Sequence, residues 1–288
     1  MKKLTTLFIF VSILFTIIST ISVSSEEQYT YDNKTKMLTI NYINEEKTDI
    51  HFVPWINIEY PENIVLKKGV IGIPDFMFAF MKHGNGGERL NNYDRIKTVR
   101  LPDTLKTIGW GAFELCKKLK KINIPKSVNK IDCCAFSGCE NLKQITIPGS
   151  IKSLELNTFD GCKNLKKVIM KKGVKKIGFG VFDDCKRLKS VKFSNSLISI
   201  GQGAFCDCKT LSKIKLPNKL KKIKMYAFIG CKKLKDITIP KSVKKIGAEA
   251  FGYKDQGIKK KSFTIKGYKG TAAEKYAKKN GFKFVVIK

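Results

Sequence analysis

The chain has 288 residues, 43% of them hydrophobic, which allows one large domain or two small ones with a sizeable core and excludes a chain too polar to fold. Lysine and arginine number 56 against 24 acidic residues, a net charge of +32, and such a field attracts polyanions. Two interpretations stay open: a surface for nucleic acid, phospholipid, anionic wall polymer or acidic glycan, or lysine that simply fills solvated positions.

Residues 1–25 predict a secretory signal peptide. Two lysines follow the initial methionine, Leu7–Ile18 is apolar apart from one serine and one threonine, and Val23 and Ser25 stand three and one residues before a possible cleavage site. An uncleaved anchor is the alternative, because Leu4–Val23 is just long enough to span a bilayer. In both cases we expect the rest of the chain to be secreted or at the cell surface, with no anchoring tail at its C-terminus.

Residues 26–62 are expected to form an N-terminal β cap. Within them, Tyr29–Ile40 reads YTYDNKTKMLTI, which predicts a hairpin with its turn near Asp32–Lys36. A stack of repeats leaves a bare edge at its end, and this hairpin would cover it.

A 23-residue repeat dominates residues 63–262, with the unit A-F-x-x-C-x-x-L-x-x-I-x-I-P-x-x-V-x-x-I-G-x-x. Upstream the pattern is worn: Phe78 occupies the phenylalanine column ahead of an insertion near 82–93, where HGNGGERLNN predicts a loop. Beyond the insertion the phenylalanine recurs every 23 residues without a slip, at Phe113, Phe136, Phe159, Phe182, Phe205, Phe228 and Phe251.

The columns predict the shape of one coil. The segment L-x-x-I-x-I ends in a two-residue alternation, which suits a short strand with one buried face, and the following proline ends that strand. The segment V-x-x-I-G predicts a second short extended piece, and A-F-x-x-C-x-x-L a single helical or 3-10 turn. One unit cannot bury its own apolar side, so stacked units share a continuous core and form a solenoid.

Six of the nine cysteines occupy one column between a core phenylalanine and a core leucine: Cys116, Cys139, Cys162, Cys185, Cys208 and Cys231. A free cysteine behaves as a small buried hydrophobe, so stacked thiols are the favoured interpretation. Disulfides between neighbouring coils stay possible, because one strand spacing lies within the Cα range of a bridge. Cys133, Cys134 and Cys206 lie outside the column and are better candidates for a reactive or bridged thiol, although they too could serve packing.

Residues 263–288 are expected to form a C-terminal cap. Phe263–Ile265 predicts a strand, Thr271–Glu274 a capping box that opens a short helix, Asn280–Gly281 the end of that helix, and Phe282–Ile287 a final strand. The buried side of the helix is expected to consist of Ala272, Ala273, Tyr276 and Ala277.

The unit C-x-x-L-x-x-I-x-I-P-x-x-V-x-x-I-G-x-x-A-F resembles the BspA-type leucine-rich repeat of bacterial and some protozoan surface proteins, and Gly267–Phe284 resembles the usual end of such arrays. The resemblance covers nearly all of the chain after the signal. It implies a leucine-rich-repeat solenoid of mostly short parallel strands with helical or 3-10 turns, closed by an N-terminal β-hairpin cap and a C-terminal helix–strand cap. It also implies surface recognition, because some members are adhesins for host matrix proteins or other cells.

No catalytic, cofactor or metal motif is recognisable. The two histidines, His51 and His83, lie in no H-E-x-x-H pattern, and G-x-S-x-G and P-loop motifs are missing from the sequence. Neither histidine nor carboxylate joins the cysteines at metal-ligand spacing. The acidic pair Asp183 and Asp184 falls at a coil turn, where we expect it to face solvent. The family that the chain resembles shares no catalytic residues, so we expect a protein that is not an enzyme and needs no small-molecule cofactor.

The remaining candidates are binding surfaces. The outward residues of the predicted strands, which repeat proteins commonly use for partners, are Lys121, Asn123, Gln144, Thr146, Lys167, Ile169, Ser190, Lys192, Lys213, Lys215, Asp236 and Thr238. Two lysine ladders flank the leucine column. The first lysine ladder is Lys117, Lys163, Lys186, Lys209 and Lys232; the second lysine ladder is Lys120, Lys143, Lys166, Lys189 and Lys235.

These surfaces support several functions. We expect a monomer that recognises a protein or a host or cell-surface ligand through its strands. The alternative is a polyanion binder that holds anionic polysaccharide, wall polymer or extracellular DNA through the ladders, with steep salt dependence. A purely structural envelope component is a further possibility.

Overall fold

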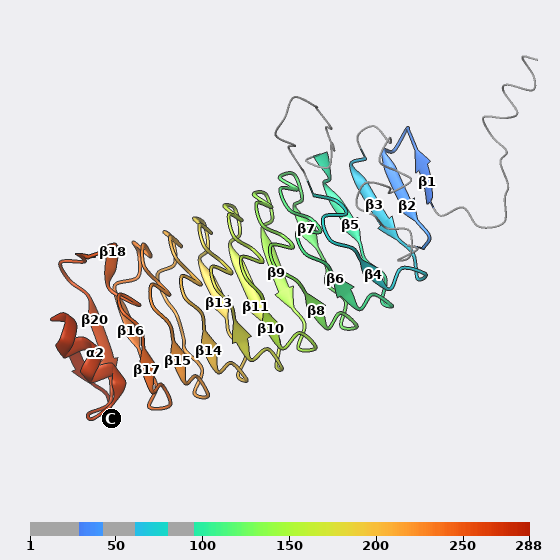
Figure 1. Cartoon of the computed structure of the whole chain (residues 1–288). Coiled ribbons are helices and arrows are strands. Elements are labelled where there is room, and N and C mark those ends of the chain that lie inside the picture. The colour runs from blue at the N-terminus through green and yellow to red at the C-terminus, as the bar shows by residue number, and fades with distance from the viewer. Residues whose placement is uncertain (1–28, 43–60, 80–94) are drawn as a thin grey trace, which may run out of the picture.

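A computed structural model of the chain describes residues 29–42, 61–79 and 95–288. They form an elongated solenoid of stacked coils, with a hairpin at one end and helix α2 (Ala272–Asn280) at the other (Figure 1). The predicted signal peptide, the predicted insertion near 82–93 and both histidines lie outside the described residues. Within the described ranges, no helix combines the length and apolar character needed to cross a membrane.

Two rows of short parallel strands run along the solenoid. The first row, called the strand face, consists of β3 (Asn63–Leu66), β5 (Thr98–Arg100), β7 (Lys121–Ile122), β9 (Gln144–Ile147), β11 (Lys167–Met170), β13 (Ser190–Lys192), β16 (Asp236–Thr238), β20 (Thr264–Gly267) and β21 (Lys283–Val286). Partners are 23 residues apart in the regular part, as where Val168 pairs with Ile145 and Val191. The predicted strand segment therefore forms as expected.

The second row, called the second sheet, consists of β4 (Gly72–Ile73), β6 (Thr107–Ile108), β8 (Lys130–Ile131), β10 (Ser153–Leu154), β12 (Lys176–Ile177), β14 (Ser199–Ile200), β15 (Lys222–Ile223) and β17 (Lys245–Ile246). These two-residue strands also pair in parallel, as where Ile177 lies opposite Leu154 and Ile200. They correspond to the V-x-x-I-G segment of the repeat.

A continuous column of phenylalanine rings occupies the core between the two rows. Phe78 stacks on Phe113, which confirms its place in the repeat across the insertion. Successive ring centroids along the column lie 4.9–5.5 Å apart with interplanar angles of 17° or less, through to Phe251. Each ring is buried and fills the space that a single coil could not close by itself.

The expected single turn after each second-sheet strand is present and uses 3-10-type bonds. Within one coil, Glu114 N–H donates to the Gly111 carbonyl and Cys116 N–H to the Phe113 carbonyl. The turn does not continue into a helix, because residues with positive φ, such as Gly111 at 56° and Leu115 at 59°, interrupt it. The interruption leaves other N–H groups free to bond the next coil, as where Phe113 N–H donates to the Ala135 carbonyl.

The N-terminal hairpin forms as predicted. β1 (Tyr29–Asp32) and β2 (Met37–Ile40) are antiparallel, and β2 then pairs in parallel with β3. The hairpin therefore extends the strand face by two strands and covers the first coil.

The C-terminal cap also forms, with one correction at its helix. Gly281 ends α2 at φ 65°, and Ala273, Tyr276 and Ala277 are buried, whereas Ala272 is half-buried. The expected capping box is absent, because the Thr271 hydroxyl donates to the Tyr268 carbonyl and leaves the helix N–H groups uncapped by a side chain. Glu274 reaches back one residue further than expected and accepts from Gly270 N–H.

A short hairpin that the repeat pattern does not predict precedes this cap. β18 (Tyr253–Asp255) and β19 (Ile258–Lys259) pair in an antiparallel manner around a turn at Gly257, whose φ is 70°. It arises where the 23-residue pattern ends, and the Tyr253 hydroxyl ties it to α2 by donating to Asn280.

Candidate functional site

The strand face presents the predicted outward residues to solvent. Lys121, Lys167, Lys192, Lys213 and Lys215 are all exposed. So is Asn123, while Ile169 is half-buried. Side chains of a strand alternate between its two faces, so the lysines point to solvent and the apolar residues between them point into the core.

The strand face is interrupted at one coil. Residues Ser212–Leu216 form no strand, and no backbone hydrogen bond joins them to either neighbouring coil in the described structure. The interruption separates β13 from β16 and leaves Val191 and Ile214 half-buried, although the equivalent Val168 and Ile237 are buried. The interrupted coil and the coil that precedes it therefore expose part of the core column.

A bulky side chain accounts for this interruption. Phe193 occupies a core column that holds smaller residues elsewhere, such as Ile147 and Leu216, and its ring packs edge-to-face on Phe205 at 5.7 Å and 86°. The next position holds Ser194 where most other coils carry proline, and this serine is buried. The larger ring holds the adjacent coil away from the hydrogen-bonding position.

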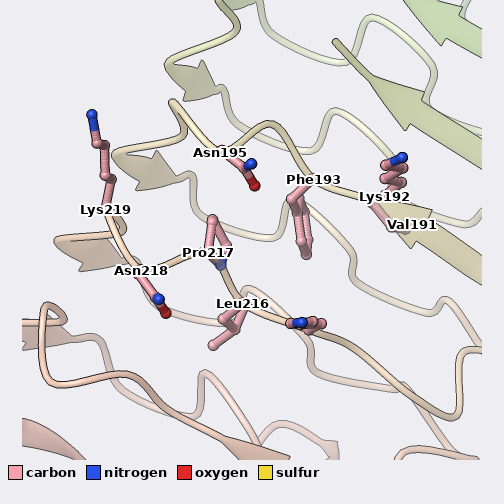
Figure 2. Close-up of a pocket in the computed structure, with 9 residues that line it drawn as sticks. Val191, Lys192, Phe193, Asn195, Leu216, Pro217, Asn218 and Lys219 are labelled. Atoms are coloured by element: carbon pink, nitrogen blue, oxygen red, sulfur yellow. The ribbon is translucent and has the colours of Figure 1, made fainter. Parts of the chain in front are cut away.

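Two open hollows flank the interrupted coil. The first, of about 600 Å³, is lined by Phe193, Leu216 and Pro217 together with polar residues, as Figure 2 shows. The second, of about 850 Å³, lies on the other side and is lined by Ile214 and several lysines. The lysines at the two hollows are Lys192, Lys215 and Lys219 in the first and Lys213, Lys232, Lys233, Lys235 and Lys266 in the second.

Five predicted binding lysines thus come together around one irregular coil: Lys192, Lys213, Lys215, Lys232 and Lys235. Sequence reasoning missed Phe193, Asn195, Asn218, Lys219 and Lys266. The sequence did contain a sign of the hollows, because Phe193 and Ser194 differ from the isoleucine and proline of the repeat unit.

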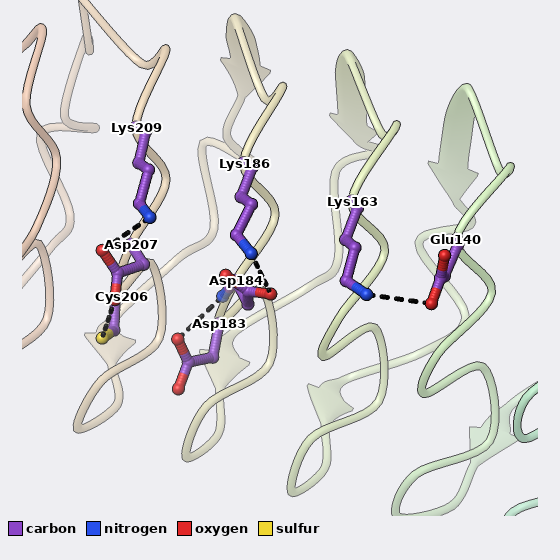
Figure 3. Close-up of polar contacts among 8 residues, drawn as sticks. All are labelled: Glu140, Lys163, Asp183, Asp184, Lys186, Cys206, Asp207 and Lys209. Atoms are coloured by element: carbon purple, nitrogen blue, oxygen red, sulfur yellow. Dashed lines mark hydrogen bonds and ion pairs between the residues drawn. The ribbon is translucent and has the colours of Figure 1, made fainter.

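Three of the five lysines of the first lysine ladder pair with acids of the same edge (Figure 3). Lys163 lies 2.9 Å from Glu140 of the preceding coil, Lys186 lies 3.2 Å from Asp184, and Lys209 lies 4.0 Å from Asp207. These pairs are partly exposed and contribute little to stability, but they remove charge that a polyanion would need.

The second lysine ladder keeps its charge. Lys120, Lys143, Lys166, Lys189 and Lys235 are all exposed, and within the described residues none of them forms an ion pair. A further lysine row, which the sequence reasoning overlooked, runs along the second sheet, partly on its strands. Its exposed members include Lys152, Lys175, Lys176, Lys221, Lys222, Lys244 and Lys245.

Asp160 and Asp183 lie in the turns that follow the second-sheet strands, here called the turn edge, and they are less exposed to solvent than the sequence suggested. Asp183 is half-buried, and burial raises the pKa of its carboxyl. Burial, aided by the negative charges of Asp183 and Asp184, raises the pKa of Asp160 to about 6. The expectation for Asp183 was wrong because its column lies one residue after the core phenylalanine, where neighbouring coils cover the carboxylate.

The cysteine column consists of buried free thiols, and all nine cysteines are free. Each laddered Sγ–H donates to the carbonyl of the phenylalanine in the preceding coil, as from Cys139 to Phe113 at 3.2 Å. Burial raises the pKa of five of these thiols, those of Cys139, Cys162, Cys185, Cys208 and Cys231, for the last to about 12. Cys133, Cys134 and Cys206 are half-buried. Within the described ranges, no group of histidine, cysteine or carboxylate side chains is arranged to hold a metal ion.

Comparison with known proteins places this arrangement among repeat proteins. A family model described as the BspA type leucine rich repeat region matches six copies, over residues 88–188 and 156–268. No curated protein matches the chain significantly.

Two solved structures share the fold. The leucine-rich repeat protein of T. pallidum is 24% identical with a TM-score of 0.55, over 74% of this chain and 90% of that one. A leucine-rich repeat protein from Eubacterium ventriosum is 19% identical with a TM-score of 0.52, over 85% of this chain and 71% of that one.

Proposed function

We propose, from the premise that this chain belongs to the BspA-type leucine-rich repeat family, that it is a non-enzymatic extracellular recognition or adhesion protein. Its ligand would be a partner protein or a cell surface, bound through the strand face. Families of this kind are compatible with protein binding and with a place at the cell surface. A signal peptide at residues 1–25 would deliver the chain there.

The observation that carries the proposal is the interrupted coil in the strand face. A regular parallel sheet offers a flat surface, whereas the hollows beside Ser212–Leu216 offer concavity, apolar walls and exposed lysines in one place. Protein interfaces concentrate their binding energy where an apolar centre is surrounded by polar groups. Phe193 and Leu216 would supply the apolar floor, and Lys192, Lys213 and Lys215 the rim.

The test is a binding screen of the purified protein against immobilised extracellular-matrix proteins and intact cells at physiological salt. For any partner found, Lys192→Gln combined with Lys215→Gln should weaken binding about tenfold, as expected for residues at an interface centre. The matched control is Lys175→Gln combined with Lys176→Gln on the second sheet, which removes the same charge from two exposed lysines. Absence of any partner, or equal losses in both variants, would contradict the proposal.

A second candidate function is polyanion binding, and the unpaired second lysine ladder favours it. Phosphate, sulfate or carboxylate groups of a wall polymer, a sulfated glycan or extracellular DNA would contact Lys143, Lys166 and Lys189 in successive coils. Counterion release dominates such contacts, so affinity should fall steeply as salt rises.

Two triple variants of equal charge test this candidate. Changing Lys143, Lys166 and Lys189 to glutamine should weaken binding to heparin or duplex DNA and lower the slope of log affinity against log salt by about one per lysine removed. Changing Lys163, Lys186 and Lys209 should have a smaller effect, because their carboxylate partners already neutralise them. Binding that does not depend on salt would exclude the candidate.

A further inference from the structure

A row of apolar side chains, exposed in three coils and half-buried at Cys133, runs along the turn edge of the solenoid. Trp110, Cys133, Leu156 and Phe179 occupy the same position in four successive coils, three residues before the core phenylalanine. Hydrogen bonds between the coils keep them adjacent: Gly111 N–H donates to the Cys133 carbonyl, Cys134 N–H to that of Leu156, and Asn157 N–H to that of Phe179. These four residues are called the apolar ridge.

The ridge is not a scatter of surface hydrophobes. Trp110 is 50% exposed, Leu156 43% and Phe179 49%, and the described chain has only seven large hydrophobic side chains exposed to a comparable degree. Three of the seven therefore fall in one row of adjacent coils. Single exposed hydrophobes need no explanation, whereas a contiguous apolar row on a soluble surface marks an interaction site.

Carboxylates stand before and after the ridge residues in the sequence, although the chain as a whole is strongly basic. Asp132 and Glu155 directly precede Cys133 and Leu156. On the other side, Glu114, Asp160 and Asp183 stand four residues after Trp110, Leu156 and Phe179. One of these acids is neutralised within the chain, since Lys130 lies 2.6 Å from Asp132. Desolvation raises the pKa of Glu114, Asp160 and Asp183, so these carboxylates would gain from a cation that replaces lost hydration.

We propose that the apolar ridge docks a cationic amphipathic helix, in which a row of apolar side chains is flanked on both sides by lysine or arginine. The ridge spans three coil steps, roughly 15 Å at about 4.8 Å per coil. Successive turns of an α-helix rise about 5.4 Å, so apolar residues three or four apart would meet successive ridge residues. Basic side chains on either flank would reach the two acidic rows.

Charge selects this occupant over a second copy of the chain. A second copy would bring a net charge of +32 against this chain, whereas a short cationic helix brings only a few charges and places them at the acidic borders, so the helix is repelled far less. The site is separate from the strand face and from the second lysine ladder, so it stands or falls independently of the proposed function.

The probe is a fluorescent 18-residue peptide of leucine and lysine with the leucines on one helical face, titrated by anisotropy onto the full chain. Trp110→Ser combined with Phe179→Ser should weaken binding about tenfold or more, because aromatic residues at an interface centre carry much of its energy. Glu114→Gln combined with Asp183→Asn should weaken binding and reduce its salt dependence. The matched control, Ile258→Ser combined with Val286→Ser, removes exposed apolar side chains elsewhere and should bind as the parent does.

Three outcomes would overturn the proposal. One is a scrambled peptide of the same composition that binds as tightly, which would indicate ion exchange. Another is unchanged binding by the ridge variant while its unfolding midpoint matches that of the parent. The third is self-association in sedimentation that the ridge variant abolishes, which would assign the ridge to a second copy.

Discussion

Equivalent residues of successive coils stack in columns, so the environment of each residue is set by its counterparts in the neighbouring coils. Each laddered thiol donates a hydrogen bond to the phenylalanine carbonyl of the preceding coil. An apolar side chain at the same position would leave that carbonyl with one hydrogen bond fewer. The same stacking brings Asp160, Asp183 and Asp184 near one another. A sequence shows the column but not how far the adjacent coil covers it, which is why the burial of Asp183 was not foreseen.

The raised pKa of Asp160, about 6 against 3.8 unperturbed, predicts a specific pH dependence of stability. The folded chain holds this proton more tightly than the unfolded chain does. The group's contribution therefore lowers the free energy of unfolding as pH rises from about 4 to about 6. Asp160→Asn should flatten the curve over this window, measured by urea unfolding at several pH values. Asp255→Asn, at an exposed carboxylate, should leave the curve unchanged; an Asp160→Asn curve parallel to that of the parent would contradict the assignment.

At the scale of elements, the repeat pattern predicted both strand rows, and the local sequence at the two ends predicted the N-terminal hairpin, α2 and its end at Gly281. These follow from local chemistry: alternation, proline, and a glycine that tolerates positive φ. The hollows were not predicted. They arise because Phe193 is larger than the other residues of its column, and the way in which the adjacent backbone adjusts to this ring depends on three-dimensional packing. Most of the predicted site lysines are exposed, but Lys163, Lys186 and Lys209 are half-buried and pair with acids. This pairing depends on the length and direction of the side chains, which the repeat pattern does not contain.

The C-terminal cap depends on one hydroxyl. Tyr276 Oη accepts from Phe251 N–H at 3.0 Å and donates to the Phe251 carbonyl at 2.9 Å, which satisfies the last coil of the phenylalanine column. Tyr276→Phe should lower the free energy of unfolding by about 1–3 kcal/mol, because it leaves two buried backbone groups unpaired. Tyr268→Phe, which removes the hydroxyl of a half-buried ring, serves as the control and should cost less than about 0.5 kcal/mol. Equal losses in urea unfolding would show that the bond does not hold the cap.

At the scale of the molecule, coils contact mainly their neighbours, so the solenoid should tolerate removal of a whole period. Deletion of 149–171 joins Pro148 to Lys172 and preserves every column. We expect this shortened protein to fold, with a circular dichroism spectrum like that of the parent and a lower melting temperature. Deletion of 149–160 removes about half a period, misaligns the columns and should abolish cooperative melting. Cooperative melting of both proteins would contradict a core built on the 23-residue register.

The even spacing of the phenylalanine column has a consequence for any ligand that is itself periodic. Rings that repeat every 4.9–5.5 Å mean that the side chains above them repeat at nearly the same interval. A polymer with regularly spaced groups could then settle in several registers related by one coil. Each added register adds one equivalent bound state, so the statistical part of the affinity would grow with polymer length once the polymer is longer than the array. A long polymer would also slide along the surface by one coil spacing at a time without dissociating.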